Sequence, residues 1–234
     1  MPDLEKPLKL VQLTDLHFGR HMFEPEVRKW VNATNLQKPD LIVITGDIVD
    51  RVISNEALDS VALELSKLSA PLGVYATLGN HDYWYVSQNQ SVHGLVKRLE
   101  KHGIRVLVND GVKIRDDFFL AGIDDLWNGE PNLERTLRDQ PKNAAKLLLS
   151  HNPDILVQVP ANIGLTLSGH THGGQIRIPG LPTLFNVSRY GERFQQGFVR
   201  GSAAGFVSRG LGVGALPLRF NCPAELVVLE LMPS

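Results

Sequence analysis

Residues 8–17 read Leu-Lys-Leu-Val-Gln-Leu-Thr-Asp-Leu-His, an apolar run that ends in an Asp-x-His pair. The run has the length of one buried strand, and the pair follows at its carboxyl end. An aspartate in this position is by itself more often a turn or cap residue than a metal ligand, because its carboxylate readily bonds nearby backbone amides. The pair Asp15 and His17 therefore leaves a turn and a metal site equally open.

Four further polar clusters follow apolar runs in the same way. They are Gly46-Asp-Ile-Val-Asp50, Gly79-Asn-His-Asp82, Ser150-His-Asn152 and Gly169-His-Thr-His-Gly173. Gly-Asp after a strand is common turn chemistry. The third cluster is more specific, since a neutral oxygen, an imidazole and a carboxylate follow Gly79, whose missing Cβ lets the backbone approach a site closely. Five such turns in this order are improbable as independent accidents, so the sequence predicts a metal centre.

The types of ligand residue narrow the choice of metal. Five of the eight lie inside the clusters, at His17, His81, His151, His170 and His172. Nitrogen and oxygen ligands without thiolates suit Mn²⁺, Fe or Zn²⁺ better than a thiolate-rich structural zinc site does. We expect two divalent transition-metal ions, and the choice among these metals is open.

The order of strand-like and helix-like segments predicts an α/β fold with two mixed β-sheets packed face to face and helices outside. Strand-like runs at 8–14, 41–45 and 73–78 alternate with helical apolar stripes, and the second half is rich in strands. The later strands are expected at 105–108, 112–114, 118–121, 146–149, 165–167, 175–178, 203–208 and 225–231. No linker divides residues 1–234, so one domain is expected, with the five clusters meeting beyond the carboxyl ends of the strands.

Composition narrows the class of protein. The chain has 234 residues, 43% of them hydrophobic, and a formal net charge of −1. No basic block stands out, so dedicated duplex-DNA binding is not expected. A single cysteine, Cys222, cannot form an internal disulfide and is expected to be a packed apolar residue in a reducing compartment. No signal peptide or membrane-spanning run is recognised, so we expect a cytoplasmic protein with peripheral membrane contact open; a missing N-terminal segment would instead imply the cell envelope.

These motifs, in this order, resemble those of the calcineurin-like metallophosphoesterase family across residues 9–231. The resemblance implies a four-layer αββα sandwich and a water nucleophile held by two metals. By position in the motifs, Asp15, His17 and His172 would bind one metal, Asn80, His151 and His170 the other, and Asp47 would bridge them. His81 matches the general acid, Asp50 the carboxylate that orients it, and Arg51 a substrate-binding arginine that contacts phosphate in some branches only.

A narrower resemblance points to a bacterial phosphodiesterase branch. Residues 168–175 and 208–220 carry it, the latter from Ser208-Arg-Gly-Leu-Gly to Pro217-Leu-Arg-Phe220. Many members of that branch carry an export signal or a membrane helix before the first strand. We recognise neither here, which puts an envelope location in doubt and leaves the chemistry unaffected.

Aromatic residues suggest the substrate. Tyr83-Trp84-Tyr85 follows His81 directly, and Trp127, Phe185 and Tyr190 fall in loops that could join it. These rings either pack the loops or form an apolar lip, with Trp84 binding a bulky or lipid-bearing leaving group. We expect a phosphodiester or pyrophosphate substrate rather than a phosphomonoester, and leave lipid-linked and nucleotide-containing substrates open.

Two other functional classes compete with this interpretation. A non-catalytic scaffold of the same fold would be favoured by loss of the acid or of a ligand, but His81 and all seven ligand positions are present. A metal-dependent hydrolase of another bond type, such as an amidohydrolase or peptidase, usually shows His-x-His on the first strand or His-Glu-x-x-His on a helix, and neither occurs. Hydrolysis of a P–O bond, with His81 as acid, is the prediction.

Overall fold

The computed structural model describes residues 1–50, 54–84, 92–183 and 186–234. Its strands are β1 (Leu8–Leu13), β2 (Leu41–Thr45), β3 (Val74–Thr77), β4 (Ile104–Val106), β5 (Asp110–Arg115), β6 (Phe118–Gly122), β7 (Ala145–Leu149), β8 (Leu165–Ser168), β9 (Gly197–Arg200), β10 (Ala204–Val207) and β11 (Val227–Leu231). Its α-helices are α1 (Glu24–Leu36), α2 (Asn55–Leu65), α3 (Asn80–Trp84), α4 (Val92–Lys101) and α5 (Leu133–Thr136). Short 3₁₀ helices are η2 (Pro153–Val157), η3 (His172–Gly174) and η4 (Gly191–Phe194).

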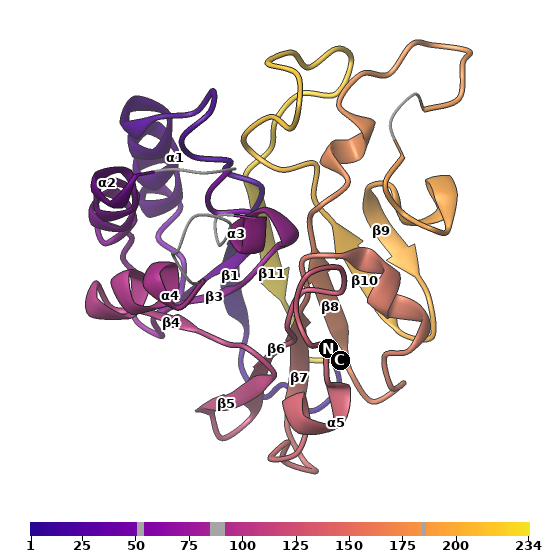
Figure 1. Cartoon of the computed structure of the whole chain (residues 1–234). Coiled ribbons are helices and arrows are strands. Elements are labelled where there is room, and N and C mark those ends of the chain that lie inside the picture. Colours follow the sequence, from indigo (N-terminus) through magenta and orange to yellow (C-terminus); the bar gives the residue numbers. More distant parts are fainter. Residues whose placement is uncertain (51–53, 85–91, 184–185) are drawn as a thin grey trace.

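The strands form two mixed sheets, as the sequence predicted. The first has the order β11-β1-β2-β3-β4 and the second the order β5-β6-β7-β8-β10-β9 (Figure 1). Pairing is parallel except for β1 with β11, β5 with β6 and β9 with β10. Because parallel strands run in one direction, their carboxyl ends meet at one edge of each sheet.

Strand β1 shows how the core is divided. Its side chains alternate between faces, as in any strand. Val11 and Leu13 join the apolar cluster under α1, α2 and α4, whereas Leu8 and Leu10 join the cluster between the two sheets. The cluster between the sheets also contains Leu147 of β7, so the two sheets pack face to face.

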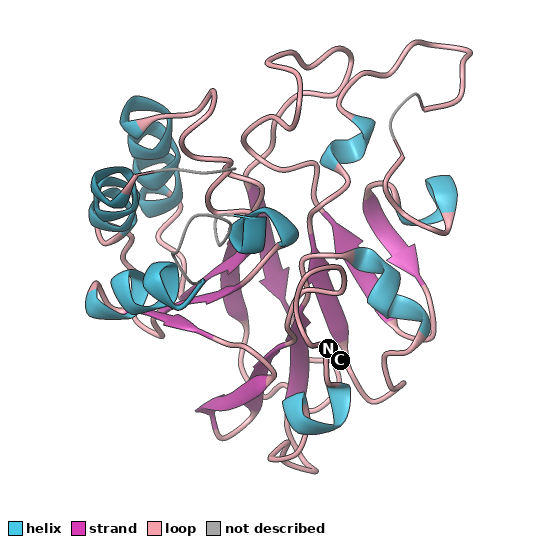
Figure 2. Cartoon of the chain, in the orientation of Figure 1, coloured by secondary structure: helices cyan, strands magenta, loops and turns pink. Residues whose placement is uncertain are grey.

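The outer layer of the second sheet is thinner than that of the first. A third apolar cluster covers this face and includes Ile155 of η2, Ile163 and Leu137 just after α5. The four-layer arrangement is therefore present with long helices on one side and short helical segments on the other (Figure 2). No helix among the described residues combines the length and the apolar character needed to cross a membrane.

The predicted strand at residues 175–178 is wrong. Gln175 ends the η3 turn at a φ of 55°, and only an isolated bridge joins Ile176 to Phe220. Strand β9 was not predicted, because its four residues Gly-Phe-Val-Arg are too short to give a pattern. Figures 1 and 2 show long loops gathered at one end of the molecule, with both termini near the other end.

Candidate metal centre

The polar clusters occupy the loops that follow the strands of both sheets. Asp15 and His17 follow β1, Asp47 follows β2, and Asn80 begins α3 after β3. His151 follows β7, and His170 and His172 follow β8. All seven predicted metal ligands therefore lie near the carboxyl ends of parallel strands, three from the second sheet and four from the first.

The backbone of five of these residues is left-handed. The φ angles are 53° at Asp15, 48° at His17, 50° at Asp47, 71° at His170 and 51° at His172. Positive φ is uncommon outside glycine, and each instance costs about 1–3 kcal/mol, so it persists only where surrounding structure holds it. Strain of this kind concentrates at functional sites, which supports a functional role for these loops.

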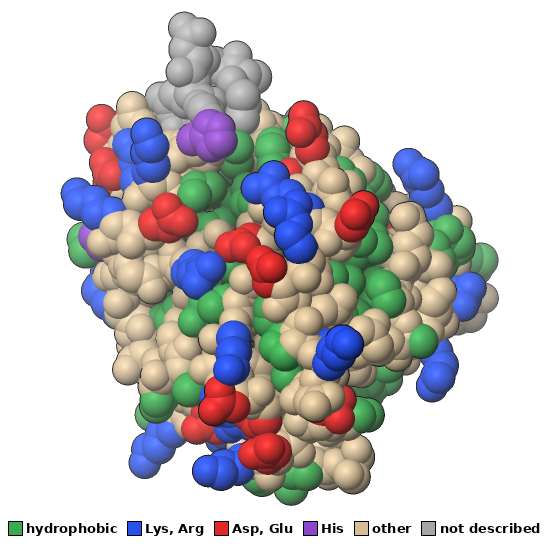
Figure 3. Space-filling view, turned by 90° about the horizontal axis from the view of Figure 1, so that it is seen from below, with side chains coloured by type: hydrophobic (Ala, Val, Ile, Leu, Met, Phe, Trp, Pro, Cys, Tyr) green, Lys and Arg blue, Asp and Glu red, His purple; other side chains and the backbone are tan. Residues whose placement is uncertain are grey.

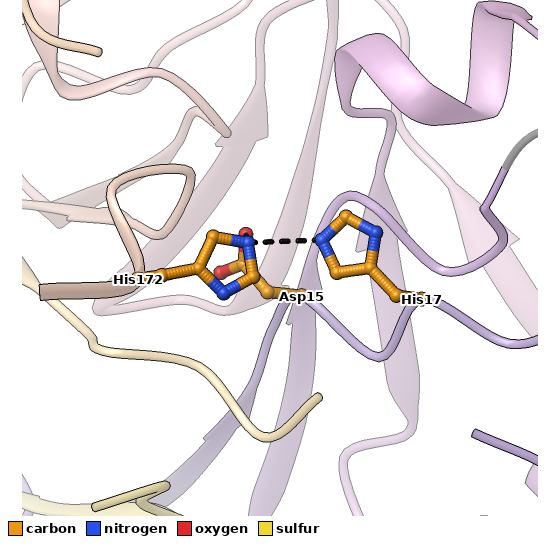
Figure 4. Close-up of side chains that lie close together, drawn as sticks. All are labelled: Asp15, His17 and His172. Atoms are coloured by element: carbon orange, nitrogen blue, oxygen red, sulfur yellow. Dashed lines mark hydrogen bonds and ion pairs between the residues drawn. The ribbon is translucent and has the colours of Figure 1, made fainter. Parts of the chain in front are cut away.

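The first group brings Asp15, His17 and His172 together (Figure 4). The Nε2 atoms of His17 and His172 lie 3.0 Å apart, and Nε2 of His172 lies 3.4 Å from Oδ1 of Asp15. Burial lowers the pKa of His17 to about 4 and that of His172 well below its usual value. Both imidazoles are therefore held neutral, which is the form that binds a metal ion.

The second group contains Asp47, His151 and His170. Nε2 of His151 lies 3.2 Å from Oδ2 of Asp47 and 3.2 Å from Nδ1 of His170. The other ring nitrogen of His151 lies 2.8 Å from the backbone oxygen of Thr45. Donation from Nδ1 to that carbonyl would fix the ring with Nε2 toward the centre, as carbonyls commonly do for metal-binding histidines.

Asp47 contacts both groups. Its Oδ2 atom lies 3.6 Å from Nε2 of His17 in addition to its contact with His151. Burial by itself would raise the pKa of Asp47, but the neighbouring His151, His81 and His17 hold it well below its usual range. The carboxylate is thus ionised between two clusters of nitrogen and oxygen atoms, the position that a bridging ligand needs.

Asn80 supplies an independent test of whether the residues fit metal ions. Its side chain is 2% exposed, and its Oδ1 has no hydrogen-bond partner among the described residues. A buried carbonyl oxygen without a partner is unfavourable unless a cation or another donor satisfies it. Asn80 lines the same cleft as Asp47 and His170, so the donor set fits two divalent cations.

Two glycines allow the loops to approach the carboxylates. A Cβ at Gly79 would lie 2.3 Å from Oδ1 of Asp47, and a Cβ at Gly169 would lie 2.3 Å from Oδ2 of Asp15. Any larger residue would displace these side chains. The expectation that Gly79 permits close backbone approach therefore holds.

Asp82 stabilises the loops and is not in either group. Its buried carboxylate accepts hydrogen bonds from the backbone N–H of Ile48, Val49 and Gly79, at 2.9, 3.0 and 2.8 Å. It thereby ties the loop after β2 to the start of α3.

His81 pairs with Asp50 instead of joining the two groups above. Nδ1 of His81 lies 2.7 Å from Oδ1 of Asp50, whose side chain is 1% exposed. Burial opposes protonation of His81, but the bond to Asp50 and the charge of Asp47 raise its pKa above the usual value. His17, Asp50 and His81 also lie close enough to hold a metal, but the direct His81–Asp50 contact favours a proton-donor pair.

Two residues that organise the site were not predicted. Gln12, inside β1, donates through Nε2 to Oγ1 of Thr45 at 2.8 Å and to the backbone oxygen of Ser168 at 3.0 Å. Arg219 donates to several loop carbonyls, including that of Gly212 at 2.7 Å, and its Nη2 lies 3.4 Å from Nδ1 of His172. A glutamine within an apolar strand was the only signal in the sequence for the first of them.

The site opens into a cleft of about 210 Å³. Trp84 lies over His81 with ring centres 4.1 Å apart, and Trp127 meets the edge of His170 at 4.4 Å. Both tryptophans line the cleft, together with Val187, Ala215 and Leu216. Trp84 and Trp127 therefore lie at the cleft, where an apolar lip would have to be.

The other aromatic residues are placed differently. Tyr83 turns away and donates a hydrogen bond to Asp124. Tyr190 packs against Phe194 with ring centres 5.3 Å apart and lines a separate hollow. Arg51, Tyr85 and Phe185 lie outside the described residues.

Comparison with known proteins identifies the family. The calcineurin-like phosphoesterase family model matches residues 8–174, which is more than half of the chain. The chain belongs to the calcineurin-like phosphoesterases. Metal-dependent phosphoester hydrolysis is the chemistry by which this family is named, in agreement with the resemblance seen in the motifs.

Three bacterial proteins are similar to this chain along almost its whole length. A Campylobacter jejuni metallophosphoesterase is 34% identical over 99% of this chain, which spans only 61% of the relative's length. YkuE of Bacillus subtilis is 35% identical over 95% of this chain and 78% of YkuE. The phosphodiesterase YaeI of Escherichia coli is 32% identical over 98% of this chain and 84% of YaeI.

Two solved structures share the fold of this chain. A Thermus thermophilus protein aligns with a TM-score of 0.55 and 13% identity, over 88% of this chain and 91% of its own. A dimetal phosphatase from Danio rerio aligns with a TM-score of 0.53 and 14% identity, over 90% of this chain and 88% of its own. These similarities confirm the predicted fold class of two mixed sheets with flanking helices.

Proposed function

We propose that this chain is a dinuclear phosphohydrolase that cleaves phosphodiesters or pyrophosphates in preference to phosphomonoesters. The observation that carries the proposal is the position of Asp47, whose Oδ2 lies 3.6 Å from Nε2 of His17 and 3.2 Å from Nε2 of His151. A carboxylate shared in this way suits two neighbouring cations better than one.

The seven ligands divide between the two cations as the motifs suggest. Asp15, His17 and His172 would hold one, Asn80, His151 and His170 the other, and Asp47 both. Two such cations, of Mn²⁺, Fe or Zn²⁺, offset charge on the phosphoryl oxygens and lower the pKa of an attacking water. The contact of His151 with the Thr45 carbonyl keeps one ring nitrogen directed at the site.

His81 is proposed as the proton donor to the leaving oxygen. Asp50 accepts a hydrogen bond from Nδ1–H of His81 and so orients the ring, which leaves Nε2 as the nitrogen that delivers a proton to substrate. The bond to Asp50 and the charge of Asp47 raise the pKa of His81 and so favour the protonated form that a proton donor needs. Arg51 follows Asp50 in the sequence and is proposed to contact a phosphoryl oxygen.

The preference for a diester rests on the balance of charge and apolar surface in the cleft. A phosphomonoester dianion generally needs cationic side chains in addition to the metals. The described residues that line the cleft include no lysine or arginine, whereas Trp84, Trp127 and Leu216 supply apolar surface. The phosphodiesterase name of YaeI, 32% identical to this chain, supports the same preference.

The deciding experiment compares two substrates on protein reconstituted with each metal. Metal-free protein is titrated with Mn²⁺, Fe²⁺ or Zn²⁺, and kcat/KM is measured for bis(nitrophenyl) phosphate and nitrophenyl phosphate. We expect activity to reach its maximum near two metals per chain and to be higher on the diester. Two bound metals without turnover of either substrate would favour the non-catalytic scaffold, and a higher kcat/KM on the monoester would contradict the diester preference.

We propose one domain for residues 1–234, because each ligand group combines residues from both sheets. The proposed location is the cytoplasm, with contact at the membrane surface. Fractionation of cells that carry the natural gene tests the location directly.

A further inference from the structure

Six large apolar side chains are exposed on two loops at the mouth of the cleft. We call them the apolar loop patch: Ile178, Leu181, Val187, Leu216, Leu218 and Phe220, exposed by 40, 58, 38, 45, 55 and 52%. The three apolar core clusters of the described residues contain none of the six. A set of exposed apolar side chains in one region marks a site of interaction more often than scattered single ones do.

Hydrogen bonds hold the two loops side by side. The backbone N–H of Arg177 donates to the oxygen of Phe220, and the N–H of Phe220 donates to the oxygen of Gln175, both at 2.9 Å. The Gln175 side chain adds bonds of 2.8 Å to the backbone of Gly214 and of Leu216. These bonds join residues 175–177 of one loop to residues 214–220 of the other; both loops lie among those at the top of Figure 1.

The same part of the chain carries an excess of positive charge. Residues 154–225 contain six arginines, no lysine, one aspartate and two glutamates, which leaves a formal charge of +3, whereas the whole chain has −1. One of the six, Arg209, forms an ion pair with Glu225. These arginines are spaced apart, which is why no basic block stands out. The face at the opposite end of the molecule carries both acidic and basic side chains (Figure 3).

The patch continues into the cleft. Val187 and Leu216 belong to both, and they lie with Trp84 and Trp127 around the proposed metal ligands. Exposed apolar side chains with an excess of cations are the combination that binds an anionic bilayer, because apolar tips enter the interface while arginines attract the headgroups. A nucleic acid would use the arginines but gains little from exposed leucines, and a second copy would bring the same positive charge.

We propose that the apolar loop patch docks on the surface of an anionic membrane and presents the cleft to phosphodiesters at the level of the headgroups. The part of this proposal that concerns the cleft rests on the proposed function, because only an active site needs to face the headgroups. The docking itself does not depend on catalysis and can be measured without it.

Vesicle flotation tests the docking. The protein is mixed with vesicles of phosphatidylcholine alone, or of phosphatidylcholine with about one-third phosphatidylglycerol. The test variant is Leu181→Ser/Leu218→Ser, which changes two patch residues that do not line the cleft. The matched control is Leu36→Ser/Leu63→Ser on α1 and α2, where the two leucines are 79% and 54% exposed. A third variant, Arg177→Gln/Arg189→Gln, removes two of the positive charges.

We expect the wild type and the control to float with the anionic vesicles, and both test variants to float at least about fivefold less. Hydrolysis of soluble bis(nitrophenyl) phosphate should be unchanged in all three variants, which shows that they fold. Equal flotation of wild type and Leu181→Ser/Leu218→Ser would overturn the proposal. Absence of binding to anionic vesicles would also overturn it. So would a wild-type dimer that Leu181→Ser/Leu218→Ser disrupts, or binding of wild type and Leu181→Ser/Leu218→Ser to duplex DNA with equal affinity. Flotation without any hydrolysis would retain the docking surface and reject the proposed function.

Discussion

Nδ1 of His81 lies 2.7 Å from Oδ1 of Asp50, a carboxylate that is almost completely buried. Asp50 comes from the loop after β2 and His81 from helix α3 after β3, and so the contact depends on how these strands pair. It links a histidine at the mouth of the cleft to a fixed charge beneath it.

Asp50→Asn should lower kcat by roughly tenfold or more. An amide keeps the shape of the carboxylate but loses the negative charge that orients His81 and stabilises its protonated form. Asp50 acts through His81, so His81→Ala/Asp50→Asn should be little slower than His81→Ala. The measurement is kcat on an alkyl phosphodiester, with metal content checked in each variant. Fully additive losses would show that Asp50 has a separate role.

His81→Ala should retain its metals and lose turnover in a way that depends on the leaving group. We expect kcat to fall by roughly 10² to 10⁴ for a poor leaving group and far less for nitrophenolate, which departs without a proton. His102→Ala is the control, since this histidine lies just after α4 and does not line the cleft. Equal losses on both substrates, or loss of metal, would be inconsistent with proton donation.

Asp47→Asn should impair both metal sites, because its Oδ2 contacts a histidine of each ligand group. The metal content of the purified protein, measured by elemental analysis, should fall from about two metals per chain to well below that value. Asp59→Asn, at an aspartate that is 65% exposed on α2, should keep full occupancy. Full occupancy in Asp47→Asn would remove the bridging assignment.

Trp84→Ala should raise KM for bulky diesters more than it lowers kcat, since an apolar wall binds substrate and transition state alike. The KM for nitrophenyl phosphate, which has one aryl group, should change less. Steady-state kinetics on both substrates provides the comparison. An unchanged KM for the diester would leave Trp84 with a packing role against His81 only.

Glu64→Gln should lower the melting temperature near pH 7 and have less effect in acid. Glu64 of α2 pairs with Arg28 of α1 and with Lys67 just after α2, each with an N···O distance of 2.8 Å. These bonds lower the pKa of Glu64 below its usual value. Because the folded-state pKa is lowered, the stabilisation is complete above the unfolded value and is lost as the pH falls through the folded one. Thermal melts at several pH values, with exposed Glu100→Gln as control, test this; a constant difference at all pH values would contradict it.

Much of the fold followed from local pattern. Strands β1 and β2 are apolar runs with a polar residue at each carboxyl end, and the apolar stripe over Val27 and Val31 predicts α1. The predicted strand after His172 failed because Gln175 adopts a positive φ, which no propensity indicates. Helix α3 was missed because its five residues are also the polar motif and carry no apolar period.

Part of the candidate site could likewise be predicted from short motifs, whereas the rest depends on contacts between residues far apart in the sequence. Residue types and spacing indicated the ligands, and the family resemblance grouped them. The roles of Gln12 and Arg219 could not be predicted, because each acts on partners brought close only by folding; Gln12 bonds to Ser168, which is 156 residues away. Such contacts leave no periodic trace in a single sequence.

Gln12 lies where the two sheets come together beneath the cleft, and each ligand group is completed only across that junction. Residues up to His81 include every ligand of the first sheet but lack His151, His170 and His172. A folding intermediate with one sheet formed would thus hold only part of each site. Metal uptake would report the docking of the sheets, and bound metal would oppose their separation by mass action. Chelators should accordingly lower the cooperativity of unfolding as well as abolish turnover.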